Sequence, residues 1–317
     1  MKKHHDSATT PPTGWRRVAT LVLAATALAL PPARADTYLF SILVGNGAGL
    51  DHTDGTGTNA RFFNPTSIAI DAAGTLYVAD GGDHTVRKIT AGGVVTTLAG
   101  ASGQAGSNDG TGSGARFQYP YAIAVDAGGN VYVTDIGDHT VRKITAGGSV
   151  STLAGMAGVG GFADGVGTTA QFNLPQGIAV DTTGNVFVAD TNNSTIRKIA
   201  PNGTVTTFAG AAGQTGTADD VGGNARFSYP FGLAVDSVGN VYVADFGNSS
   251  IRKITTGGNV TTLAGTSGQT GSVDGTGIGA RFDHPSAISG DAAGNVWVVD
   301  TSNQTIRRIT VGGNFTT

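Results

Sequence analysis

The hexapeptide NVYVAD, Asn240–Asp245, recurs with small changes along the chain. The other copies are TLYVAD ending at Asp80, NVYVTD at Asp135, NVFVAD at Asp190 and NVWVVD at Asp300. Successive copies are always 55 residues apart. Self-similarity at a fixed period of this length is typical of solenoids and propellers, in which one small structural unit is repeated many times.

Each 55-residue unit contains four short runs rich in Val, Ile and Thr. In the fourth unit they read GLAVD, NVYVAD, SIRKIT and NVTTLAG, with Gly, Asn and Ser between them. Such runs predict strands, and the tight Gly and Asn punctuation predicts hairpins. No stretch has a clear helical period. Each unit is therefore expected to form a four-stranded antiparallel sheet.

The second strand of a unit is apolar on both faces. Val241 and Val243 point to one side, while Tyr242 and Ala244 point to the other. A strand that is apolar on both sides must be covered by neighbouring sheets. Units arranged around an axis cover one another in this way, so we predict an all-β fold: a β-propeller of five 55-residue repeats with four-stranded antiparallel blades.

The stretch GLAVDSVGNVYVADFGNSSIRKI, residues 232–254, resembles the NHL repeat, which carries the pattern P-x-G-I-A-V-D…G-x-I-Y-V-A-D…N-x-R-I in each blade. The resemblance extends over essentially the whole chain after residue 35. It implies a propeller, usually six-bladed, that acts mostly as a binding platform.

The two ends of the repeat region complement each other. Residues 38–60 align with a fourth strand and the loop that follows it, whereas residues 281–313 supply strands one to three. We therefore expect the N-terminal strand 38–45 to complete the last blade in a closed five-bladed ring, which removes exposed strand edges. The alternative is a six-bladed ring truncated at the C-terminus, because residues 314–317 begin a fourth strand of their own.

The first 35 residues have the layout of a secretory signal peptide. Basic residues up to Arg17 precede an uncharged, mostly apolar stretch at 18–30, and Pro-Pro and Ala-Arg-Ala follow, ending at Ala35. The apolar stretch is too short to span a bilayer, which takes about 20 residues. We predict cleavage near Ala35 and an exported propeller, residues 36–317, that is periplasmic or secreted. The Arg16-Arg17 pair leaves the general and twin-arginine routes open.

Composition limits the possible partners. After residue 35 the chain has 14 basic and 21 acidic residues, a formal net charge of −7. This balance argues against nucleic acid, which requires clustered Lys and Arg. There is no cysteine, and every acidic residue is Asp. Disulfides and Cys-ligated metals are excluded, and Glu, a common general acid in sugar chemistry, is missing.

One face of the predicted ring is the better candidate for binding. It carries the strand 2–3 turns and the inter-blade loops, which are longer and differ more between units than the turns of the other face. Just before the first strands this face places aromatic and His side chains around the predicted channel mouth. They can stack on sugars, peptides or apolar ligands, or they can fill gaps between blades. The candidates are Phe63, Tyr119, Tyr121, Tyr229, Phe231 and His284.

Metal binding has weak support. His84 and His139 occupy the same place in two successive 2–3 turns, but a metal requires three or four converging ligands. The Asp-Gly of four inter-blade loops, as at Asp54, predicts a turn rather than a calcium site, and the remaining loop has Asp219 followed by Asp220. No metal and no other cofactor is predicted.

An Arg in the third strand follows the second-strand Asp by seven residues in every unit. The hairpin between them brings the two side chains close enough for a charge-assisted bridge. Because every blade repeats the pair, we interpret it as structural. The pairs are Asp80–Arg87, Asp135–Arg142, Asp190–Arg197, Asp245–Arg252 and Asp300–Arg307.

These observations favour an exported, non-catalytic scaffold that binds a protein, peptide or glycan through the long-loop face. The resemblance also implies an alternative, a propeller enzyme of the lactonase or lyase type that uses the central channel. The chain has no Glu for a lactonase-type metal centre, few His for an amidating lyase, and no G-x-S-x-G motif. A third possibility is a spacer within a larger surface protein.

Overall fold

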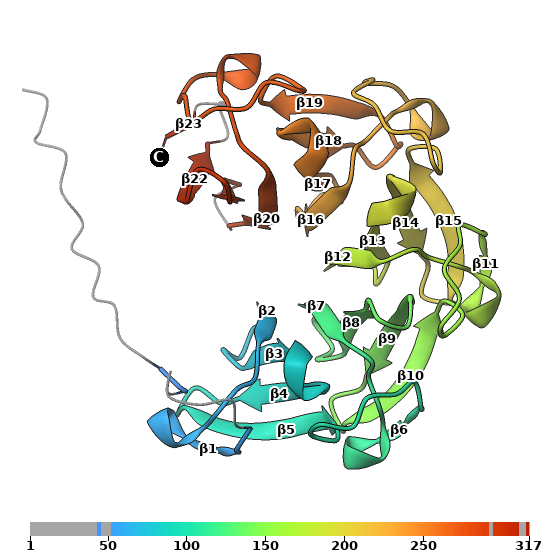
Figure 1. Ribbon diagram of the computed structural model, residues 1–317, viewed down its shortest axis with the longest axis vertical. Helices are drawn as coiled ribbons and strands as arrows, with labels where there is room; N and C mark the ends of the chain where they lie inside the picture. The colour runs from blue at the N-terminus through green and yellow to red at the C-terminus, as the bar shows by residue number, and fades with distance from the viewer. Residues whose placement is uncertain (1–42, 46–51, 292–293, 311–314, 317) are drawn as a thin grey trace, which may run out of the picture. The chain divides into compact units, whose positions relative to one another are not determined.

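The computed structural model describes residues 43–45, 52–291, 294–310 and 315–316. The predicted signal peptide therefore lies outside the described residues. The described residues form five antiparallel β-sheets. Figure 1 shows the sheets in chain order around a central opening, with the first strand of each sheet innermost. The predicted all-β, five-bladed propeller is confirmed. Within the described residues, no helix is long and apolar enough to cross a membrane.

Each sheet has four main strands. The first contains β2 (Pro65–Ile70), β3 (Leu76–Asp80), β4 (Thr85–Ile89) and β5 (Val94–Gly100). The second contains β7 (Pro120–Val125), β8 (Val131–Asp135), β9 (Thr140–Ile144) and β10 (Ser149–Ala154). The third contains β12 (Pro175–Val180), β13 (Val186–Asp190), β14 (Thr195–Ile199) and β15 (Thr204–Ala209). The fourth contains β16 (Pro230–Val235), β17 (Val241–Asp245), β18 (Ser250–Ile254) and β19 (Val260–Ala264). The fifth contains β20 (Pro285–Gly290), β21 (Val296–Asp300), β22 (Thr305–Ile309) and β23 (Phe315–Thr316).

Short elements complete the blades. Three two-residue strands extend the first three sheets at the outer edge: β1 (Gly55–Thr56), β6 (Gly110–Thr111) and β11 (Gly165–Val166). Single turns of 3-10 helix occupy the inter-blade loops and three of the strand 2–3 turns. They are η1 (Gly57–Asn59), η2 (Gly81–Asp83), η3 (Gly112–Gly114), η4 (Gly167–Thr169), η5 (Thr191–Asn193), η6 (Gly222–Asn224), η7 (Phe246–Asn248) and η8 (Gly277–Gly279).

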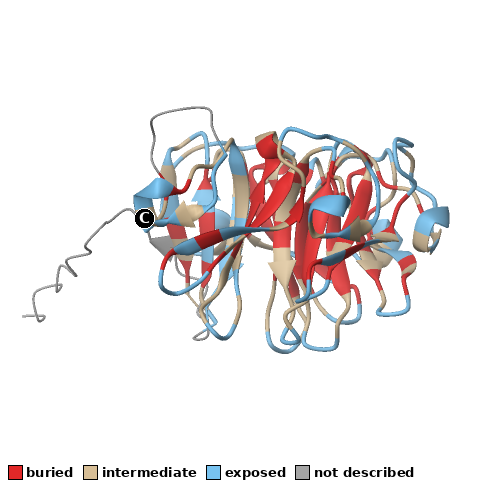
Figure 2. Cartoon of the chain, turned by 90° about the horizontal axis from the view of Figure 1, so that it is seen from below, coloured by how far each residue is buried: buried red, intermediate tan, exposed pale blue. Residues whose placement is uncertain are grey.

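The repeated hexapeptide forms the second strand, and in the first four sheets both of its faces are buried. In β17, Val241 and Val243 are 0% exposed and pack with Phe187 of the third sheet. Ala244, on the other face, is also 0% exposed and packs with Val298 of the fifth sheet. In the first four sheets each second strand thus joins two hydrophobic cores, which explains why it lacks polar alternation, whereas in the fifth sheet Trp297 and Val299 are 40% and 39% exposed. Figure 2 shows these buried residues concentrated in the strands, with the exposed residues in the loops.

The fifth and first sheets differ from the others at the flanks that face each other in the ring. β22 pairs with β23 at its outer edge. Residues 38–42 lie outside the described residues, so completion of the last blade by 38–45 stays a prediction. The Gly45 amide donates to the Gly57 carbonyl at 3.0 Å, which attaches this segment to the first sheet. Ile306 is 65% exposed, whereas Ile251, its equivalent in the fourth sheet, is 0% exposed.

Candidate functional site

The third-strand arginines are buried and join three parts of each blade. In the fourth sheet, Arg252 Nη1 lies 2.8 Å from Asp245 Oδ2 and Nη2 lies 2.5 Å from Asp219 Oδ1 of the preceding inter-blade loop. The guanidinium carbon lies 5.2 Å from the centre of the Phe227 ring. The loop aspartates therefore bind arginine, and the same contacts recur around Arg87, Arg197 and Arg307. Arg142 differs, because its Nη1 is 3.8 Å from Asp135 Oδ2.

The second-strand aspartates are buried acids with matched hydrogen-bond donors. Burial raises the pKa of Asp245 to about 6, while the charge of Arg252 and the Ser228 amide act in the opposite direction. Burial likewise raises the pKa of Asp190 to about 6 against the Asn173 amide and Arg197. Each of these acids ends the second strand and accepts the amide of a residue just before the first strand, so it joins these two parts of the blade. Neither side chain lines the central cavity.

The two candidate histidines link neighbouring blades. His84 Nδ1 lies 2.8 Å from the Gln118 carbonyl oxygen, and the Leu174 amide donates to His139 Nδ1 at 3.1 Å. Both residues have a left-handed backbone, with φ of 60° and 58°. In the part of the chain that the structure describes, no group of three or more His, Cys, Asp or Glu side chains could hold a metal.

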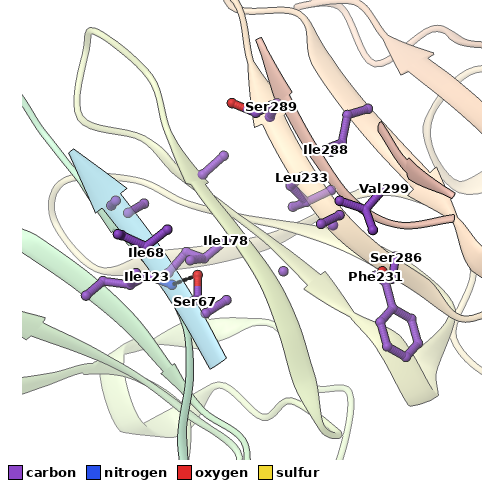
Figure 3. Close-up of a pocket in the computed structure, with 18 of the residues that line it drawn as sticks. Ser67, Ile68, Ile123, Ile178, Phe231, Leu233, Ser286, Ile288, Ser289 and Val299 are labelled. Carbon is purple, nitrogen blue, oxygen red and sulfur yellow. Dashed lines mark hydrogen bonds between the residues drawn. The ribbon is translucent and has the colours of Figure 1, made fainter. Parts of the chain in front are cut away.

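A cavity of about 790 Å³ lies at the centre of the ring and is lined by the first strands of all five sheets. In Figure 3, Ile68, Ile123 and Ile178 lie on one side and Leu233 and Ile288 on the other. Its polar side chains are uncharged, and none of the described lining residues is Asp, His, Lys or Arg. The cavity therefore favours an uncharged, partly apolar group. Its polar side chains are Thr66, Ser67, Tyr121, Gln176, Ser286 and Ser289.

Aromatic side chains from the fourth and fifth sheets meet at the cavity. The Phe231 and Phe246 rings stack with centroids 4.5 Å apart and an interplanar angle of 24°. The His284 ring lies 4.7 Å from Phe246. Phe231 lines the cavity, and Figure 3 shows it beside Ser286. The His284 ring is tilted by 56° to Phe246, so this aromatic row, Phe231–Phe246–His284, offers aromatic faces and edges against which a ligand ring can pack.

The remaining candidates lie in different settings. Tyr121 lines the cavity, and burial together with nearby Tyr119 raises the pKa of its phenol. The Tyr119 hydroxyl accepts a hydrogen bond from Asn64 Nδ2 at 2.6 Å. Tyr229 is 49% exposed and does not line the cavity. Phe63 does not line it either, and its amide donates to Asp80 at 2.8 Å.

Sequence reasoning did not single out Phe246, which joins Phe231 to His284. The signal was present, because Phe246 follows the second-strand Asp at a position where the other units have small or aliphatic residues. A lone aromatic residue at a variable turn position is a departure that the fold does not require. The equivalents are Gly81, Ile136, Thr191 and Thr301.

His284 also lies beside an acid and a hydroxyl. Its Nδ1 is 2.5 Å from Asp283 Oδ1, and Ser302 Oγ is 3.4 Å from the same nitrogen. In a Ser-His-Asp triad the acid and the nucleophile occupy opposite ring nitrogens. This arrangement therefore orients the imidazole against Phe246 and does not activate Ser302.

The comparisons with known proteins agree on the fold. The NHL repeat family matches residues 172–199 and 227–254. The chain is 26% identical to NHL repeat-containing protein 2 of Bos taurus over 289 residues, covering 80% of the chain and 40% of that protein. It spans less than half the length of the curated relatives it matches.

Two solved structures are similar in fold at low sequence identity. An auxiliary nutrient binding protein from Bacteroides ovatus has a TM-score of 0.60 at 18% identity, covering 80% of this chain and 60% of that chain. Virginiamycin B lyase from Staphylococcus aureus has a TM-score of 0.53 at 16% identity, covering 80% and 68%. The 55-residue repeats, the five radial sheets and the NHL repeat match at residues 172–199 and 227–254 show an NHL-repeat β-propeller.

Proposed function

We propose that this propeller is an exported, non-catalytic scaffold that binds a protein, peptide or glycan through the face that carries the 2–3 turns and inter-blade loops. The observation that carries the proposal is the aromatic row Phe231–Phe246–His284 beside a cavity of about 790 Å³. Stacked rings beside uncharged polar groups suit a ligand that presents a sugar ring or an apolar side chain. Export is supported by the signal-like first 35 residues.

The alternative is an enzyme of the lactonase or lyase type, and similarity in fold to virginiamycin B lyase brings it into consideration. Such an enzyme needs a group that moves a proton or polarises a bond at the channel. Among the described lining residues, Tyr121 is the only one with a titratable side chain, and burial raises the pKa of its phenol. This chemistry favours the scaffold over the enzyme.

The test is a binding screen with the purified protein against arrays of glycans and peptides. Phe231→Ala and Phe246→Ala should each weaken a genuine hit by about fivefold, because a stacked aromatic contact is worth about 1 kcal/mol. Val238→Ala is the matched control, since Val238 is 72% exposed in the strand 1–2 turn of the opposite face. Equal affinity in all three variants would refute the proposed site. Turnover of a hit would favour the enzyme.

A further inference from the structure

The second sheet departs from the other four where the chain leads into β7. Here the Ile136 amide donates to the Tyr119 carbonyl at 3.1 Å. In the fourth sheet the bond joins Gly247 and the Ser228 carbonyl at 2.8 Å, and these residues are equivalent to Gly137 and Gln118. Tyr119 is also absent from the residues with positive φ. Its four equivalents all have φ between 48° and 57°: Asn64, Leu174, Tyr229 and His284.

A difference in charge accompanies this difference in backbone. The third, fourth and fifth sheets have Asn193, Asn248 and Asn303 in the 2–3 turn. Asn248 Nδ2 donates to Asp245 Oδ2 at 2.8 Å and to the Gly216 carbonyl at 2.6 Å, and the other two make the same pair of bonds. The second sheet has Asp138 at this position, and an ionised carboxylate cannot donate either bond.

The second-strand Asp135 is displaced accordingly. Its Oδ2 accepts the Gln118 amide at 2.8 Å and its Oδ1 accepts the Tyr119 amide at 2.6 Å. Arg142 Nη1 is left 3.8 Å away. Asp138 is 9% exposed, and its Oδ2 is buried without a hydrogen-bond partner. Two adjacent buried carboxylates repel each other, so Asp135 turns away from Asp138 and accepts the Tyr119 amide in addition to the Gln118 amide. Its equivalents accept the amide at the Gln118 position.

The first sheet is an internal control, because it has Asp83 at the Asp138 position. Thr85 Oγ1 donates to Asp83 at 2.9 Å and Ser102 Oγ at 2.5 Å, and His52 Nδ1 lies 3.2 Å from the carboxylate. Asp80 keeps its bond to Arg87 at 3.1 Å. The second sheet has Ala157 and Ser107 where the first has Ser102 and His52. The acid of the first sheet is therefore satisfied by three side chains, whereas the acid of the second sheet keeps only the equivalent of Thr85, which is Thr140.

We propose that Asp135 and Asp138 form a proton-binding pair that controls the backbone at Gln118–Tyr119 and so the shape of the channel mouth. A proton from solvent binds the Asp138 carboxylate, and the resulting hydroxyl donates to Asp135 as Asn248 donates to Asp245. Asp135 then turns back to Arg142 and releases the Tyr119 amide. The Tyr119 backbone then shifts, and the hydrogen bond between its hydroxyl and Asn64 Nδ2 shifts with it. This regulation rests on the proposed function, because it acts on the same mouth.

The charged and titratable groups that face Asp138 are Asp135 and His139 of the same hairpin and Arg142 of β9, whose other nitrogen binds Asp109. Burial raises the pKa of Asp138, against the charges of Arg142 and His139. Burial raises the pKa of Asp135 to about 6, with the Tyr119 and Gln118 amides lowering it and Asp138 raising it. A proton is thus favoured on Asp135 as the pH falls through about 6, and the raised pKa of Asp138 lets the two carboxylates share it.

The experiment is an amide-resolved NMR titration of the purified protein between about pH 5 and about pH 7.5, the range around the pair's transition. The Gln118 and Tyr119 signals of the wild type should shift together with one midpoint. In Asp138→Asn the Tyr119 signal should stay near its low-pH position throughout, because Asp135 then binds the Gln118 amide alone, as Asp245 binds the Ser228 amide. Asp83→Asn should leave the Tyr119 titration unchanged. A Tyr119 signal that does not titrate, or that titrates equally in Asp138→Asn, would overturn the proposal.

A gain-of-function variant keeps the test decisive. Asn193→Asp places an acid in the third sheet, where Ala212 and Phe162 stand at the positions of Ser102 and His52. The Leu174 amide donates to His139 Nδ1 in the wild type, so the readout is the Asn173 amide, which donates to Asp190. Its titration should differ from that of the wild type, and an unchanged titration would contradict the proposed cause. The readout needs no ligand, so it is independent of the binding screen. A titrating pair with no glycan or peptide hit would reject the proposed function alone.

Discussion

Arg252 is 0% exposed, between two carboxylates and the face of Phe227. A buried ion pair contributes little net stability over an apolar replacement of the same shape, because desolvation offsets the attraction. Removal of one partner is different, since it leaves an uncompensated buried charge. The repeated arginine therefore specifies the geometry at the junction of strand two, strand three and the inter-blade loop.

Arg252→Ala should lower the free energy of unfolding by about 3–5 kcal/mol, because Asp245 loses its buried partner and a large cavity opens. Arg226→Ala is the control: this side chain is held at the surface by Gln214 and two carbonyl oxygens, and its loss should cost about 1 kcal/mol or less. Urea unfolding followed by circular dichroism measures both. Equal losses in the two variants would contradict a structural role for the buried pair.

At the scale of the element, the hairpins depend on two kinds of position. Asp236 closes the turn between β16 and β17 by accepting the Asn240 amide at 2.8 Å and Asn240 Nδ2 at 2.8 Å. Gly210 follows β15 with φ of 89°, and a Cβ there would lie 2.7 Å from the Ser194 carbonyl oxygen. The turn at Asp236 therefore needs a carboxylate, and the position of Gly210 needs a residue without a side chain.

Gly210→Ala should destabilise the protein by more than about 2 kcal/mol, because it combines left-handed strain with a backbone clash. Gly213→Ala isolates the strain, since Gly213 has φ of 72° but open space around its Cβ position. The cost there should be about 1 kcal/mol. Thermal unfolding of both variants checks the difference, and identical losses would show that the close approach to Ser194 is unimportant.

The turn acid also predicts a pH dependence. Burial raises the pKa of Asp236, but hydrogen bonds from Asn240 outweigh it and hold the pKa below its usual value. An acid whose pKa is lower in the folded than in the unfolded protein stabilises the fold at any pH above its unfolded pKa. This stabilisation is lost as the pH falls through the folded pKa. Asp236→Asn should therefore be less stable than wild type by about 1 kcal/mol near pH 6 and no less stable below about pH 3. Urea midpoints across this range test it, and a gap that widens on acidification would contradict it.

At the scale of the whole molecule, the stability of each blade depends on its neighbours. Ala244 and Ile251 of the fourth sheet pack with Val296 and Val298 of the fifth. The equivalent flank of the fifth sheet exposes Val299 by 39% and Ile306 by 65%. The same residue type at the same repeat position therefore contributes differently according to its place in the ring.

Ile251→Ala should cost about 2–5 kcal/mol, because it opens a cavity between two sheets. Ile306→Ala should cost less than about 1 kcal/mol, because most of that side chain is already in contact with water. The two substitutions are chemically identical, so unfolding midpoints compare position alone. A comparable loss at Ile306 would show that another segment covers this flank in solution.

Much of the molecule could be predicted from particular residues. The five Asp–Arg pairs were expected because the partners lie seven residues apart across one hairpin. The further contacts of Arg252 with Asp219 and Phe227 were not, because these residues come from the preceding loop and the start of the blade. Among the candidates at the mouth, Tyr121 and Phe231 line the cavity while Tyr229 points elsewhere, a difference set by backbone direction.

By itself, the amino-acid sequence determined the repeat, the four strands of each blade and the propeller class. The strands and turns follow from short Val, Ile and Thr runs with Gly and Asn between them, which are properties of residues close in the chain, and the propeller class follows from the 55-residue repeat of that pattern. Only the tertiary structure decided that Phe246 joins Phe231 to His284, and that Asp83 finds donors while Asp138 Oδ2 has no hydrogen-bond partner among the described residues. Those outcomes depend on side chains from different loops and blades meeting in space, and no local pattern encodes that meeting.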